Sequence, residues 1–72
     1  MKMTPVESSM ISSVGHDGAK KVLRVAFNIG AVWEYSGVPE EVYAALLAAG
    51  SKGSYMRSCV IGAYPERQLR RR

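Results

Sequence analysis

The chain has 72 residues, of which 47% are hydrophobic and 22% are charged, and its net charge is +4. A chain this short folds as one domain and buries only about 60% of its unfolded surface, so its stability is small. The single cysteine excludes an internal disulfide and a cysteine-rich zinc site, and it fits a reducing compartment. No apolar run approaches the ~18 residues that a membrane span needs. We therefore expect a cytoplasmic protein without a membrane segment, cofactor or metal.

The positive charge is concentrated at the end of the chain. Residues 66–72 contain four arginines and one glutamate, a net charge of +3, whereas residues 1–65 contain six basic and five acidic side chains, a net charge of +1. A nearly neutral body with a basic end favours a basic appendage over a broad basic face. We predict a single domain over residues 1–65 with a short N-terminal arm, followed by a flexible basic tail over residues 66–72.

The first strand is expected over residues 8–15, after a loose arm and before the turn signal Asp17–Gly18. Side chains alternate across a strand, so Val14 should share one face with Met10 and Ser12, and Ile11 should share the other face with serines alone. Neither face is cleanly apolar, and such a strand suits the edge of a sheet.

A hairpin is predicted over residues 23–35. Two runs with period-two alternation flank the turn residues Asn28, Ile29 and Gly30, which is a strong hairpin signal. One face of this hairpin should be apolar and carry Leu23, Val25, Phe27, Trp33 and Tyr35. An isolated hairpin is marginal in water, so this face needs a partner.

A first helix is predicted to begin at Pro39, whose missing N–H would be unpaired there, and to end at Gly50. Two glutamates in its first turn favour the positive end of the helix dipole. Residues at helical spacing form its apolar face, namely Val42, Tyr43, Leu46 and Leu47.

A second helix is predicted with Ser51 as N-cap and Pro65 as its stop. It carries a broad apolar stripe of Tyr55, Met56, Cys59, Val60, Ala63 and Tyr64. The predicted fold is therefore α+β, a three-stranded antiparallel β-meander packed against two short C-terminal helices.

Taken in chain order, these residues resemble a known family, the KTSC domain. The resemblance covers about residues 6–64 and rests on Val6-x-Ser8-Ser9-x-Ile11-x-Ser13-Val14-Gly15-His16-Asp17, a Leu-x-Val-x-Phe strand, Gly-x-Val-Trp-x-Tyr, Val38-Pro39, Val42-Tyr43 and Ser51-x-Gly53-x-Tyr55. Two positions depart from the family pattern: His16 stands where the family usually has tyrosine, and Trp33 stands where tyrosine is common. Both positions keep a ring, so the fold that the resemblance implies is unaffected.

The family takes its name from the C-terminus of some lysyl-tRNA synthetases and also occurs as a small free-standing protein in bacteria and phages. The resemblance implies nucleic-acid binding. The size and the Ala- and Arg-rich composition are also similar to those of a small phage protein that inhibits the RNA polymerase of its host.

Catalytic residues are not apparent. His16 is the only histidine, and its pairing with Ser13 or Cys59 lacks a nucleophile elbow and an oxyanion loop. We predict that His16 is a structural or surface ring beside a turn, that Cys59 is a buried inert thiol, and that the protein is not an enzyme.

Two features are candidates for partner binding. Unless the arm covers it, the first strand should leave an open sheet edge that accepts or donates a strand to a partner, and the binding residues expected there are Val6, Ser8, Ser9 and Met10. The tail offers guanidinium groups that would meet either phosphates or an acidic protein surface, from Arg67, Arg70, Arg71 and Arg72.

The predicted function is that of a non-enzymatic, phage-type regulator in a bacterial cell. We expect it to be a monomer that docks on transcription machinery, with RNA polymerase as the partner, and inhibits by occupying a contact. The alternative is an RNA- or tRNA-binding module of the KTSC type.

Overall fold

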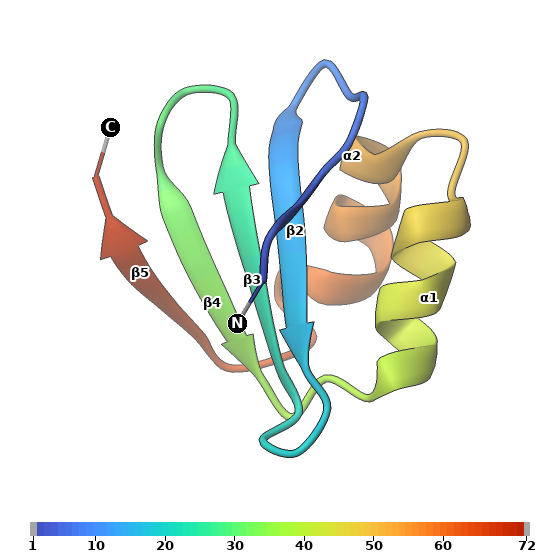
Figure 1. Cartoon of the computed structure of the whole chain (residues 1–72), viewed down its shortest axis with the longest axis vertical. Helices are drawn as coiled ribbons and strands as arrows, with labels where there is room; N and C mark the ends of the chain where they lie inside the picture. Colours follow the sequence, from blue (N-terminus) through green and yellow to red (C-terminus); the bar gives the residue numbers. More distant parts are fainter. Residues whose placement is uncertain (1, 72) are drawn as a thin grey trace.

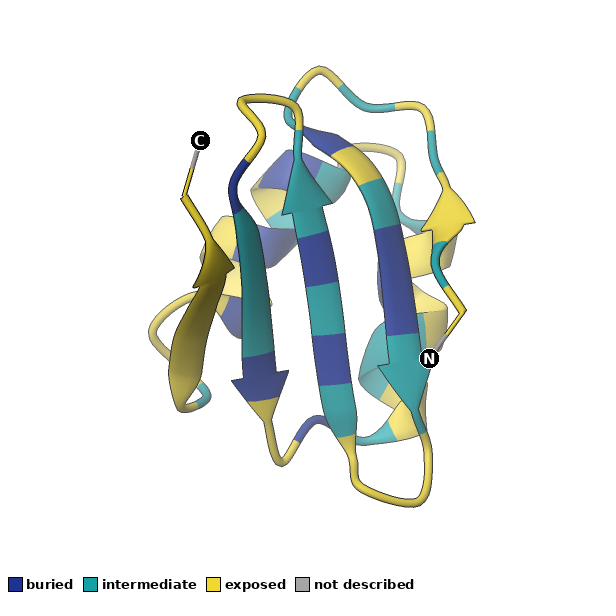
Figure 2. Cartoon of the chain, turned by 60° about the vertical axis from the view of Figure 1, so that its left-hand side comes forward, coloured by how far each residue is buried: buried dark blue, intermediate teal, exposed yellow. Residues whose placement is uncertain are grey.

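The computed structural model describes residues 2–71 and contains one antiparallel sheet of five strands in the order β1-β2-β3-β4-β5 (Figure 1). The strands are β1 Thr4–Pro5, β2 Ile11–Asp17, β3 Val22–Phe27, β4 Val32–Ser36 and β5 Glu66–Arg70. The helical segments are α1 Glu40–Ala48, α2 Lys52–Tyr55 and a π-helical turn, η1 Met56–Val60. All three lie on one face of the sheet (Figures 1 and 2). No helix of the described residues is long and apolar enough to cross a membrane.

The predicted hairpin is confirmed as β3 and β4. Leu23 stands opposite Tyr35 and Val25 opposite Trp33, so their side chains share the face that meets the helices. Gly30 has a φ of 98°, a left-handed conformation that favours glycine, and its N–H donates to the carbonyl of Phe27 at 2.9 Å. The core is built on this face, from Ile11, Val14, Leu23, Val25, Tyr35, Val38, Leu46, Met56 and Val60.

The first strand differs from its prediction in the direction of one side chain. Ile11 pairs with Phe27 and Val14 with Val25, and both are fully buried on the helix-facing side. The register shifts between Ile11 and Ser13, so an extra residue at this bulge turns Ile11 to the same face as Val14. The expectation of opposite faces was wrong because strict alternation ends at a bulge.

Helix α1 begins directly after Pro39 and buries Leu46 completely, while Leu47 remains 37% exposed. Ser51 caps α2 as predicted, because its Oγ accepts a hydrogen bond from the Ser54 N–H at 3.3 Å. The predicted single second helix is instead α2 followed by η1, in which the Ile61 N–H reaches back five residues to the Met56 carbonyl. The wider π turn rotates the stripe, so Met56 is buried and Cys59 is exposed.

The sheet has two strands more than the predicted meander. β1 pairs with β2, and β5 pairs with β4, so the chain returns to the sheet after its helices. The α+β class is confirmed, but the helices are not C-terminal. Residues 66–70, expected to be a flexible tail, are an edge strand because they find partners on β4.

Candidate functional site

The sheet has one face without a helix on it, which we call the outer face (Figures 1 and 2). Three side chains form a line across it, because Arg24 stands opposite Glu34 on β3 and β4, and Glu34 stands opposite Arg67 on β4 and β5. We call these three residues the charged row. Their signs alternate from strand to strand, an arrangement that stabilises cross-strand neighbours.

The charged row is held by two ion pairs to one carboxylate. Glu34 Oε2 accepts from Arg24 Nη2 at 2.9 Å, and Glu34 Oε1 accepts from Arg67 Nη2 at 3.1 Å. The hydrogen bond from Arg24, and the positive charge of both arginines, lower the pKa of Glu34 below its ordinary value. The Glu34 side chain is only 14% exposed, whereas that of Arg67 is 74% exposed. Arg67 therefore keeps guanidinium donors directed at solvent.

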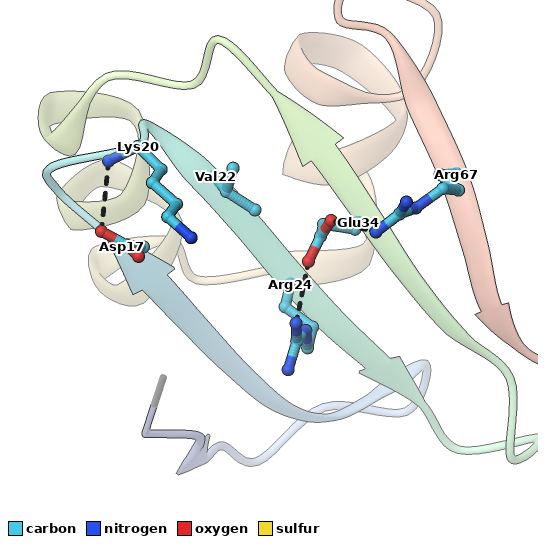
Figure 3. Close-up of a pocket in the computed structure, with 6 residues that line it drawn as sticks. All are labelled: Asp17, Lys20, Val22, Arg24, Glu34 and Arg67. Carbon is cyan, nitrogen blue, oxygen red and sulfur yellow. Dashed lines mark hydrogen bonds and ion pairs between the residues drawn. The ribbon is translucent and has the colours of Figure 1, made fainter.

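A hollow of about 310 Å³ lies beside the charged row (Figure 3). Its remaining lining comes from Asp17, Lys20 and Val22. Asp17 Oδ1 accepts hydrogen bonds from the backbone N–H of Ala19 and of Lys20, and the Lys20 bond is the main cause of its lowered pKa. The carboxylate of Asp17 thus stabilises the β2–β3 turn, and Lys20 adds a positive charge to the hollow.

Strand β5 contains most of the predicted basic tail. Arg67 and Arg70 face outward with the charged row, since Arg70 stands opposite Val32, two residues from Glu34 on β4. All five residues of β5 are exposed (Figure 2). Arg71 follows the strand and is exposed, and Arg72 lies outside the described residues.

Three of the four predicted binding residues of the arm have contacts within the domain. The Val6 N–H donates to the Ser12 carbonyl at 3.0 Å, and Ser8 Oγ accepts from the backbone N–H of Met10 and of Ile11 at 3.1 and 3.2 Å. Val6 and Met10 also pack against the core. Met10 Sδ lies 3.0 Å from the position that a Cβ would take on Gly53, so the arm contacts α2 closely.

The open edge expected at the first strand is not present. β1 occupies the free side of β2, with Thr4 opposite Val14 and Pro5 opposite Ser13. The N-terminal arm therefore covers the edge that a partner was expected to use. Ser9 is exposed in the loop before β2.

His16 and Cys59 lie on different elements, β2 and η1. The His16 ring stacks on Tyr43 of α1, with ring centroids 5.3 Å apart, and its Nε2 lies 2.7 Å from the Val38 carbonyl oxygen. Cys59 is exposed, which corrects the expectation of a buried thiol. Within residues 2–71, no group of three or more His, Cys, Asp or Glu side chains is arranged to hold a metal ion.

Arg24 and Glu34 were missed as site residues by sequence reasoning. The signal was present, because both occupy polar positions of the hairpin at matching distances from its turn. The pairing of Leu23 with Tyr35 places Arg24 opposite Glu34 in the same register. Arg67 joins them only through the pairing of β4 with β5, for which residues 66–70 carry no β-branched or aromatic signal.

The fold and the charged outer face define a small two-layer α+β domain with a basic edge strand. The family model for the KTSC domain matches residues 7–64, and the chain belongs to the KTSC domain family. A protein from Tsukamurella paurometabola is 45% identical over 58 residues, which are 81% of this chain and 87% of that protein. An uncharacterized protein from Stutzerimonas stutzeri is 42% identical over 55 residues, which are 76% and 78% of the two chains.

A solved structure supports the same architecture. The crystal structure of a KTSC domain protein from Yersinia pestis is 31% identical and superposes with a TM-score of 0.90. The match covers 96% of this chain and 97% of the Yersinia chain. Such coverage leaves about three of the 72 residues unmatched, so the likeness continues past residue 64 into β5.

Proposed function

We propose that this KTSC domain is a non-enzymatic binding protein and that its partner-binding surface is β5 with the adjoining outer face. The observation that carries the proposal is the position of Arg67 and Arg70 on an exposed strand at the edge of the sheet. The basic residues and the open edge, expected in two separate places, thus belong to one element.

The surface is positively charged overall. Lys20, Arg24, Arg67 and Arg70 contribute four positive charges, and Asp17, Glu34 and Glu66 contribute three negative charges. The exposed Arg71 adds one more at the end of β5. An anionic partner is therefore attracted to this side of the domain, and salt weakens the attraction.

An acidic protein surface fits this site better than nucleic acid does. The aromatic side chains of the sheet, Phe27, Trp33 and Tyr35, pack toward the core on the helix-facing side. The described outer face therefore offers no ring on which a base would stack, and stacking contributes much of single-strand binding. RNA or tRNA is the second candidate, and it rests on the arginines alone.

We propose a bacterial protein as the partner, with RNA polymerase as the first candidate to test. The domain would act by occupying a contact of that partner, because the charged row contains no nucleophile and no general base with a reacting partner. Docking through the first strand loses its support, since β1 covers that edge.

Affinity purification from a bacterial lysate tests the proposal. The bait is the full chain, and the lysate is treated with nuclease and washed at moderate salt. We expect Arg67→Gln with Arg70→Gln to lose the captured protein, because the exposed positive charge of β5 is removed. The matched control is Lys52→Gln with Arg57→Gln, which removes the same charge on α2 and η1, on the opposite side of the sheet.

The outcomes separate the two candidates. Capture by the β5 double variant at the level of the wild type would exclude β5 as the docking surface. Loss of the captured material on nuclease treatment would replace the protein partner with nucleic acid. Circular dichroism of each variant establishes that the sheet has formed.

A further inference from the structure

We infer that the partner binds by adding an extended acidic segment to β5 as a sixth strand of the sheet. This inference rests on the proposed function and specifies the chemistry of its partner. Three observations support it: the unpaired edge of β5, the direction of its main-chain groups, and the alternating signs of the charged row.

The outer edge of β5 has no partner among residues 2–71. The sheet ends at β5, which pairs with β4 on its other side, and every residue of β5 is exposed (Figure 2). Such an edge presents a row of main-chain N–H and C=O groups that a further strand can pair with. At the opposite end of the sheet, the edge strand β1 has only two residues, Thr4 and Pro5, so it offers a partner strand a much shorter edge than β5 does.

The direction of the main-chain groups on β5 follows from one hydrogen bond. The Ser36 N–H donates to the Pro65 carbonyl at 2.9 Å, so Pro65 faces β4. In an antiparallel ladder the residues alternate between facing the partner and facing away. Arg67 therefore faces β4 with its main chain, and the N–H and C=O groups of Glu66 and Gln68 face the free edge.

The charged row specifies the side chain that would lie beside β5. From β3 to β5 the signs run positive, negative, positive, through Arg24, Glu34 and Arg67. A side chain opposite Arg67 on a sixth strand would lie about 5 Å from it between Cβ atoms. An acidic side chain there continues the alternation and pairs with guanidinium donors of Arg67 that Glu34 leaves free.

A second copy of this chain does not fit the edge. Pairing of two β5 strands about a two-fold axis would place Arg67 and Arg70 of both copies on one face of the joined sheet. Like charges on neighbouring strands destabilise a sheet. The register also shifts between the partners of Val32 and Trp33, so β5 is bulged near Leu69 and long self-pairing is interrupted.

Nucleic acid also cannot pair with all the main-chain groups of this edge. A phosphate group only accepts hydrogen bonds from main-chain N–H groups, so it leaves the outward carbonyls of Glu66 and Gln68 without a partner. A peptide main chain offers both donors and acceptors, at the spacing of a strand.

The experiment uses a short capped peptide in which glutamate alternates with valine, titrated into the ¹⁵N-labelled full chain. We expect the amide signals of Glu66 and Gln68 to shift and their hydrogen exchange to slow. We expect Gln68→Pro to weaken binding about tenfold or more, because proline removes the outward N–H. Gln68→Thr keeps the N–H and should bind as the wild type does.

The controls do not depend on how the proline variant folds. A peptide that is N-methylated at alternate residues cannot pair along one edge, and we expect it to lose binding with the protein unchanged. A peptide with lysine in place of glutamate should bind about tenfold more weakly or not at all, because Arg67 and Arg70 repel it.

Each contrary result overturns a defined part of the inference. Equal binding by Gln68→Pro, or by the N-methylated peptide, would exclude strand addition. If strand addition were excluded but Arg67→Gln with Arg70→Gln still abolished capture, β5 would remain the docking surface of the proposed function, with a different mode of binding. Equal binding of the lysine peptide would exclude an acidic partner. A dimer in sedimentation that Gln68→Pro dissociates would assign the edge to a second copy.

Discussion

Tyr35 connects the core of this domain to its alkaline stability. Its side chain is 2% exposed, and burial, with the Glu66 carboxylate as a smaller cause, raises the pKa of its phenol to about 12. Glu66 stands opposite Tyr35 in the β4–β5 register, so the position of β5 contributes to this pKa. The buried phenol resists ionisation, whereas the same phenol in the unfolded chain ionises near its ordinary pKa of 10.0.

The sign of the pH dependence follows from the two pKa values. Above about pH 10 the unfolded chain releases the Tyr35 proton while the folded chain retains it, so the free energy of unfolding falls as pH rises. The slope is about 1.4 kcal/mol per pH unit until the folded group also ionises near pH 12. At about pH 11 the wild type should therefore have lost about 1.4 kcal/mol, a large part of the ~3–5 kcal/mol expected for a domain of this size.

The perturbation is Tyr35→Phe, and the assay is urea unfolding followed by circular dichroism at about pH 8 and about pH 11. Loss of stability that comes from lysines and from the other three tyrosines is common to both proteins and cancels in the difference. The wild type should lose about 1.4 kcal/mol more than the variant over this range. Equal losses in the two proteins would refute the assignment of a raised pKa to Tyr35.

Three further substitutions test the core, a helix cap and the charged row, each by urea unfolding. Leu46→Ala should lower the free energy of unfolding by about 2–5 kcal/mol, because Leu46 is fully buried. Leu47→Ala should lower it by less than about 1 kcal/mol, because Leu47 is 37% exposed. Similar losses in the two variants would contradict the orientation of α1. Ser51→Ala should lower the free energy of unfolding by about 1 kcal/mol, because it removes the acceptor for the Ser54 N–H. Ser51→Asp keeps an acceptor at this position and should be as stable as the wild type. Glu34→Gln should cost about 0.5–1 kcal/mol at neutral pH. Because the folded pKa of Glu34 is lowered, its stabilisation is present above the ordinary glutamate pKa and is lost as pH falls through the folded value. The Glu34→Gln difference should therefore disappear in acid, and a difference that persists there would exclude the ion pairs as its cause.

The two binding features predicted from the sequence converge on one element in the structure. An open sheet edge was expected at the first strand, and a basic patch was expected in a flexible tail. The arm closes the first edge through β1, and the tail forms the opposite edge as β5. The expected mode of binding, strand addition together with charge attraction, is thus proposed for residues 66–70, while Val6 and Met10 contribute to packing.

The fold could be predicted where the signal was local. Alternation in residues 23–35 indicated the hairpin and its apolar face, and Pro39 and Ser51 marked the helix starts. The π-helical turn was not predictable in this way, because apolar residues at helical spacing do not show where a turn takes an extra residue. That turn places Cys59 on the surface, although the residue lies in an apolar stripe of the sequence.

The hairpin, the helix starts and the KTSC pattern follow from the order of residues, since each depends on neighbours a few positions away. The bulge after Ile11, the covered edge of β2 and the strand at residues 66–70 depend on contacts between distant segments. Thr4 and Pro5 pair with β2, and Arg67 pairs with Glu34, although neither segment has strong strand propensity of its own. A segment with weak strand propensity becomes a strand only when its main chain pairs with a neighbouring strand. For these two segments the neighbouring strands exist only once the central sheet has formed.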